Sequence, residues 1–324
     1  MEFLNKFDRQ KLQRITLIVI AALTLIALVL LLVIIIGSVE GGSRPDDIDD
    51  PAFDNIDKFN TETVNVTSAQ LGKGSLLVVN KSNKYDIPAD LNLVSIYEYR
   101  AEHRGNAEST YNLPDSSQKL EVNAMMHAHN MLMALGDATK NHNIMISSAF
   151  RTHAEQAALN NDTQAGYSDS HTGQLIALKV MGSATPYLPD ESNADLYNWL
   201  LNNAHKYGYV VRYPSDKADK TYVSEYTYAF RYVGVAHATY MKENNLCLEE
   251  YVELLKSNHN GVDNRLRIVG ADGSAYVVYY TAVSADGGNV KVPIQTPNPD
   301  GSTSYPYTIS GTNEGGVVVT VKLN

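Results

Sequence analysis

The chain has 324 residues, of which 44% are hydrophobic and 19% charged, an ordinary globular composition that excludes wholesale disorder. Its formal net charge of −10, without a cluster of lysines and arginines, excludes a nucleic-acid partner, because phosphate backbones are bound by concentrated positive charge. The single cysteine, Cys247, excludes an internal disulfide, so the fold depends on packing.

Near the amino terminus, residues 15–36 are uncharged and almost wholly aliphatic. At about 1.5 Å rise per residue, this segment is long enough to cross a bilayer core as a helix. A cleavable signal peptide is the alternative, but its apolar region is shorter, about 7 to 15 residues. Lysines and arginines precede the segment and aspartates follow it, so the positive-inside rule puts residues 1–14 in the cytoplasm. We therefore expect a single-pass cell-membrane protein whose bulk is extracytoplasmic.

Residues 37–70 contain adjacent glycines, prolines and many aspartates, a composition that stays solvated. A calcium loop would need aspartates at alternate positions followed by a glycine and a later glutamate, and that spacing is absent. We predict an acidic flexible stalk over 37–70.

The next segment, 71–258, alternates short β-prone runs with helical periodicity. Strands are expected at 75–80, 91–97, 144–147, 175–180, 209–213 and 229–233. A long helix is expected from an N-cap at Asp115, Ser116 or Ser117 to Gly136, and further helices at 153–159, 193–206, 235–243 and 248–255. Without a regular βαβ alternation, this mixture predicts an α+β domain.

Residues 259–324 hold short β-prone runs at 266–269, 275–280, 290–293, 305–309 and 316–321, separated by turn residues. We predict a small all-β module. With about 65 residues its own core would be marginal, so we expect it to pack on the main domain or to bind something. Its tyrosines are compatible with carbohydrate or protein contact, although tyrosine in strands mostly serves packing.

Four motifs in one order carry a family resemblance. They are Ser147-Ser-Ala-Phe-Arg151-Thr with Gln156, Ser168-Asp-Ser-His-Thr-Gly173, Trp199-Leu with Ala204-His-Lys-Tyr-Gly-Tyr-Val-Val-Arg-Tyr-Pro214, and Phe230-Arg-Tyr-Val-Gly234. Together they resemble the VanY-type D-alanyl-D-alanine carboxypeptidases, zinc enzymes of bacterial cell-wall metabolism. The likeness spans roughly residues 76–255 and implies a domain of the hedgehog/DD-peptidase type.

The resemblance also implies a zinc site whose ligands are a histidine, an aspartate seven residues later and a second histidine, with a glutamate as general base. In a gapless alignment these positions are occupied by Ser170, Ala177, Ala229 and Tyr226. A catalytic zinc needs about three protein ligands, and alanine has no lone pair to offer. We therefore expect no retained catalytic residue, no metal ligand and no cofactor.

His171 is one residue from a ligand position, so a shifted zinc ligand is the alternative to consider. Seven residues beyond it stands Leu178, and a one-residue slip beside a strand turns the side chain to the other face. We interpret His171 as the second, non-ligating residue of the motif.

The motif residues outside the implied zinc positions favour binding of a ligand over catalysis. Arg151 resembles the family arginine that faces the substrate, and a guanidinium suits a carboxylate. Further substrate-binding candidates share the two motifs around it, and they are Gln156, Ser168, Asp169, His171 and Thr172. Arg231, flanked by apolar residues, is expected to tie strands together.

Three hypotheses follow. The first is a membrane-anchored pseudopeptidase that binds peptidoglycan stem peptide or a cell-envelope protein. The second is an active zinc D,D-carboxypeptidase with an unconventional ligand set. The third is a scaffold with a vestigial cleft whose β module binds.

Overall fold

The computed structural model describes residue 53 and residues 60–105, 110–159, 163–182, 193–224, 226–294 and 305–324, all in one compact unit. The predicted cytoplasmic tail, the transmembrane segment 15–36 and the first part of the stalk, residues 37–52, lie outside these residues. Within the described part of the chain, no helix is long and apolar enough to cross a membrane.

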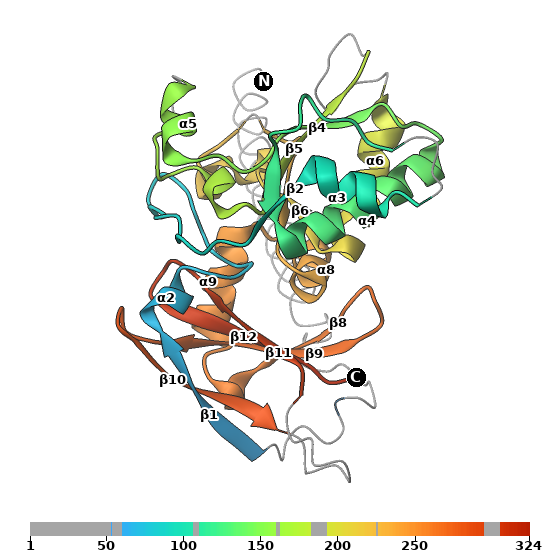
Figure 1. Cartoon of the computed structure of the whole chain (residues 1–324). Coiled ribbons are helices and arrows are strands. Elements are labelled where there is room, and N and C mark those ends of the chain that lie inside the picture. Colours follow the sequence, from blue (N-terminus) through green and yellow to red (C-terminus); the bar gives the residue numbers. More distant parts are fainter. Residues whose placement is uncertain are drawn as a thin grey trace, which may run out of the picture. The chain divides into compact units, whose positions relative to one another are not determined.

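A four-stranded antiparallel sheet lies at the centre of the main domain (Figure 1). Its order is β4 (Ile144–Ser148), β5 (Leu175–Val180), β7 (Ala229–Tyr232) and β6 (Tyr209–Val211). Helices α4 (Val122–Thr139) and α6 (Ala194–Asn203) pack against it through the predicted apolar stripes. The shared core includes Met125, Leu132, Ile146, Leu200 and Phe230, all fully or almost fully buried.

Shorter elements surround this sheet. They are β2 (Leu93–Ser95), α3 (Ile96–His103), β3 (Lys119–Glu121), α5 (His153–Ala158), η3 (Asp169–Thr172), η5 (Ala204–Tyr207), η6 (Ser215–Lys217) and α7 (Ala218–Thr221). Helix α2 (Ser68–Leu71) lies instead with the C-terminal strands (Figure 1). Strands β2 and β3 form a separate antiparallel pair.

The C-terminal residues form a second antiparallel sheet, as predicted. Its order is β11 (Tyr307–Gly311), β12 (Gly316–Lys322), β9 (Ala275–Ala282) and β8 (Leu266–Val269), with η7 (Val262–Asn264) before it. Helices α8 (Val235–Glu243) and α9 (Leu248–Asn258) share one core with this sheet, which includes Tyr251, Leu255, Val278 and Val318. The β module therefore packs on the main domain and does not form a core of its own.

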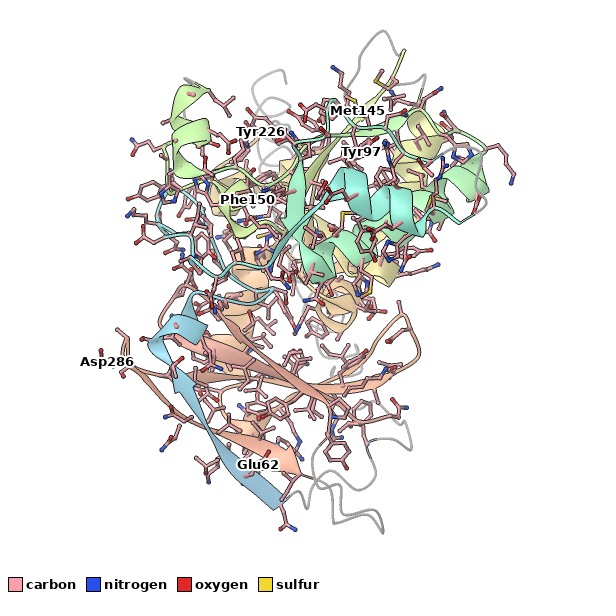
Figure 2. All side chains as sticks on the ribbon, viewed as in Figure 1. Glu62, Tyr97, Met145, Phe150, Tyr226 and Asp286 are labelled. Carbon is pink, nitrogen blue, oxygen red and sulfur yellow. The ribbon has the colours of Figure 1, made fainter. Side chains whose placement is uncertain are left out.

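The predicted stalk ends earlier than residue 70. Strand β1 (Asn60–Thr67) pairs antiparallel with β10 (Gly287–Ile294) over eight residue pairs, and Val66 is buried (Figure 1). Figure 2 labels Glu62, which lies opposite Val292 in this pair. The prediction of a stalk through residue 70 is wrong for residues 60–70, because the alternation of Val64 and Val66 with polar residues is a strand pattern.

One predicted strand is wrong and another is too long. Residues 75–80 form no strand, although 76–80 are buried, because the main-chain groups of Leu77, Val78 and Val79 bond instead to arginine side chains and to Thr312. The run 91–97 contains only the three residues of β2, since Ser95 caps α3 by accepting from Glu98 N at 3.3 Å. The cap of α4 is Glu121, not the predicted segment 115–117.

Candidate functional site

A pocket of 370 Å³ opens beside the sheet where the family motifs meet. All four positions of the implied zinc site line it: Ser170, Ala177, Tyr226 and Ala229. Ala177 and Ala229 are register partners on neighbouring strands, and Ser170 comes from η3. The structure thus brings together residues 59 positions apart in sequence, where the gapless alignment expected one site.

Arg151 is the charged side chain of this pocket among the described residues. Its Nη2 donates to Ser170 Oγ at 2.9 Å, and its main-chain N–H donates to Ser170 O at 3.3 Å. Its Nε is buried without a hydrogen-bond partner in the described part of the chain. Burial lowers the pKa of the Arg151 guanidinium, because the charge is partly removed from water. The guanidinium nevertheless lines the pocket and has N–H donors beyond the one bonded to Ser170, which suits it to bind an anion.

The remaining walls are mostly polar or aromatic, with two aliphatic residues. They are formed by Ser147, Ser148, Gln156, Thr163, Ser168, Leu175, Tyr213, Val223 and Tyr228. Tyr226, labelled in Figure 2, is 44% exposed, and its ring meets those of Tyr213 and Tyr228 edge-on. The sequence reading missed Tyr213 and Tyr228; the pair Arg-Tyr in the third family motif is the signal that pointed to Tyr213.

The described residues do not fit a zinc ion. No histidine, aspartate, glutamate or cysteine lines the pocket within the described ranges, and those ranges hold no cluster of three such residues at metal distance. Ser170 Oγ, the side-chain oxygen at the three implied ligand positions, already accepts from a guanidinium. A cation bound at that hydroxyl repels a second cation.

Asp169 does not face the pocket. It is fully buried and accepts hydrogen bonds from Arg231 Nε at 3.0 Å and from Arg212 Nε. Arg212 also binds Glu249 through two nitrogens, at 2.7 and 2.9 Å. Although burial opposes the charge on Arg212, Glu249 and Asp169 hold its pKa well above the usual value. The network fixes η3, and with it Ser170, to the sheet and to α9.

Arg231 acts as the sequence suggested, tying segments together. Besides Asp169, its guanidinium donates to Leu77 O at 3.2 Å and to Tyr232 O at 2.6 Å, and it also binds the side chain of Gln174. Arg212 was missed, although it stands in the same kind of apolar context.

His171 is fully buried and both its ring nitrogens are engaged. Gly166 N donates to Nε2 at 3.0 Å, so Nδ1 carries the proton and donates to Arg151 O at 2.7 Å. Burial lowers the pKa of His171, which keeps the ring neutral. These contacts hold the backbone of Arg151 and leave no nitrogen for a ligand.

Of the three remaining substrate-binding candidates, one faces away from the pocket and two line it. Thr172 is buried and donates to Asp169 O at 2.7 Å, away from the Arg151 pocket. Ser168 and Gln156 line the pocket, and Gln156 Nε2 donates to Thr163 O at 2.9 Å. The structure therefore gathers Arg151, Gln156 and Ser168 at the pocket.

Comparisons with known proteins agree with the motifs. The model of the VanY D-alanyl-D-alanine carboxypeptidase family matches residues 117–235. A D-alanyl-D-alanine carboxypeptidase of Enterococcus faecium is 30% identical over 273 residues, covering 81% of this chain and 80% of the relative. The putative carboxypeptidase YodJ of Bacillus subtilis is 36% identical over 94 residues, 28% of this chain and 33% of that protein.

Among solved structures, the vancomycin-resistance D,D-dipeptidase VanXYg in complex with a D-Ala-D-Ala phosphinate analogue is similar, with a TM-score of 0.64. The likeness covers 81% of this chain and 99% of that structure at 24% sequence identity. At that identity it shows the fold, and it extends beyond the segment 117–235 matched by the family model.

Proposed function

Because the chain belongs to the VanY family of D-alanyl-D-alanine carboxypeptidases, we propose that it is a pseudopeptidase that binds the carboxyl terminus of a peptidoglycan stem peptide without cleaving it. The observation that carries this proposal is the donor set of the pocket. Where the family places a metal centre, the described residues offer a guanidinium, hydroxyls and two alanines. In this proposal the protein is anchored in the cell membrane by residues 15–36 and faces the cell envelope.

Binding would centre on Arg151. Its Nη2 is held by Ser170 at 2.9 Å, which orients the guanidinium, and the fork carries further N–H donors from which a carboxylate in the pocket would accept. Charge-assisted bonds of this kind are about twice as strong as neutral ones. The serine hydroxyls and the tyrosine rings on the walls suit the amide and methyl groups of a short peptide.

The residues that line the pocket do not favour hydrolysis of a bound peptide. An attacking water needs a base within hydrogen-bond reach, and no described carboxylate or imidazole lines the pocket. Burial also raises the pKa of Tyr213, which keeps that phenol protonated near neutral pH. The related VanXYg structure, in complex with a D-Ala-D-Ala phosphinate analogue, supports a peptide terminus as ligand.

An active carboxypeptidase is the second candidate, favoured by the 30% identity to the Enterococcus faecium enzyme over most of its length. It would need a base from outside the described residues. Glu225, the sequence neighbour of Tyr226, is the position to test. This candidate predicts zinc-dependent release of D-alanine that Glu225→Gln abolishes.

Titration calorimetry on the purified full chain tests the proposal, using a peptide that ends in D-Ala-D-Ala and the same peptide with a carboxamide terminus. The acid should bind at least about tenfold tighter, the size of one lost charge-assisted bond. Arg151→Met should remove that preference, whereas Arg104→Met, an exposed arginine outside the pocket, should keep it.

The same samples, incubated with zinc and the acid peptide, should release no D-alanine. Zinc-dependent turnover would establish the second candidate. Equal affinity for acid and carboxamide would contradict terminal capture and leave a partner protein as the ligand to seek.

A further inference from the structure

A second cavity, of 390 Å³, adjoins the Arg151 pocket. Thr163, Tyr213 and Val223 line both cavities, so the two adjoin. The other walls of the second cavity are Val79, Asn80, Lys81, Gln164, Tyr167, Thr221 and Tyr222. We call the two adjoining cavities together the extended groove; Arg151 lines one of them and Lys81 the other.

The charges along the extended groove are of one sign. Among the described residues that line it, the charged side chains are Arg151 and Lys81, although the whole chain has a net charge of −10. A different cavity, of 560 Å³, shows the contrast, since it is lined by Asp90, Glu121 and Asp272 with Lys73. Two cations without a lining carboxylate favour an anionic ligand over a neutral or basic one.

Lys81 is held in place without an anionic partner. Its Nζ lies 4.0 Å from the centroid of the Tyr222 ring, and no ion pair to it occurs within the described ranges. Tyr222 closes α7 in the left-handed conformation at φ 62°, with its N–H bonded to Ala218 O at 2.9 Å. A cation stacked on an aromatic ring keeps most of its charge available to a ligand.

We infer that the extended groove selects peptides with two negative groups, a free terminal carboxylate at Arg151 and an acidic side chain further along the peptide at Lys81. The inference rests on the proposed function and adds to it the charge of the peptide that is chosen. Lys81 is a specificity-determining residue in this account, and the three shared wall residues separate the two charged subsites.

The test compares two synthetic peptides that end in a free D-Ala-D-Ala and differ upstream only in a glutamate or a glutamine. Calorimetry on the full chain should show tighter binding of the glutamate peptide, by about threefold to fivefold, the range of one exposed ion pair. Lys81→Met should erase this difference while leaving the affinity for the glutamine peptide unchanged. Lys206→Met, an exposed lysine bonded to Asn203, should leave both affinities as in the wild type.

Each outcome is decisive. If both peptides bind equally well to the wild type, and binding depends on Arg151, the inference fails and the proposed function stands. If Lys81→Met weakens both peptides alike, Lys81 acts on folding or shape and the inference fails. If neither peptide binds the wild type, the proposed function fails and the inference with it.

Discussion

Replacing Asp169 with asparagine should destabilise the protein strongly, although this residue touches no ligand. Asparagine has the same shape and still accepts one hydrogen bond, so the substitution removes charge with little change in volume. The wild-type network contains two arginines, Arg212 and Arg231, and two carboxylates, Asp169 and Glu249. Without the charge of Asp169, one buried guanidinium has no compensating anion.

The magnitude follows from which arginine loses its partner. Arg212 keeps both bonds to Glu249, but Arg231 retains only carbonyl groups and the side chain of Gln174. Removing one member of a buried pair costs about 3–5 kcal/mol, because the other charge stays buried. Glu249→Gln should cost less, since the Glu249 side chain is 13% exposed and water can compensate.

Urea unfolding of the full chain, followed by circular dichroism, measures the difference. Asp169→Asn should lower the free energy of unfolding by about 3–5 kcal/mol, and the control Asp219→Asn, an exposed partner of Lys220, by less than about 1 kcal/mol. A loss below about 1 kcal/mol for Asp169→Asn would refute the reasoning that this network fixes η3.

Three further outcomes follow from the same structure. Burial lowers the pKa of His237 to about 3, so the unfolded chain takes up this proton first as the pH falls below 6.5, and the folded state loses stability. This loss should reach about 1.4 kcal/mol per pH unit between pH 6.5 and 4.5. In His237→Gln the loss should be absent, as measured by urea unfolding at each pH. Gly173→Ala should cost about 1–3 kcal/mol in thermal unfolding, because φ is +69° and the added Cβ would lie 2.8 Å from the Leu93 side chain. A chain truncated after residue 258 should lose cooperative unfolding by calorimetry, since the deleted strands complete the core around α8 and α9, whereas a sharp transition would contradict the shared core.

Local patterns were enough for most elements of the fold. The apolar runs of β4, β5 and β7 and the stripe of α4 are periodic within the segment itself, so the sequence predicts them within a few residues. The run 75–80 has the same composition as a strand but forms none, because its backbone partners are Arg212, Arg231 and the loop at Thr312. Those partners lie more than 130 residues away.

Some residues of the site could likewise be predicted from the sequence, and others could not. Motif positions predicted that Ser170, Ala177, Tyr226 and Ala229 share one pocket, and the structure gathers them there. The ion pair of Arg212 with Glu249 and the neighbouring cavity at Lys81 could not be read from spacing, because both depend on how distant segments pack. Asp169 and His171 are polar motif residues whose bonds point inward, and only the packing distinguishes such residues from ligand contacts.

Zinc stoichiometry tests the central claim most directly. The purified full chain, dialysed against zinc and then against metal-free buffer, is analysed by plasma mass spectrometry beside the variant Ser170→His, Ala177→Asp, Ala229→His. The account predicts no stoichiometric zinc in the wild type and about one ion in the variant, whose three ligands are restored on the same scaffold. One zinc per wild-type chain, lost when Ser170 or Tyr226 is replaced, would contradict it.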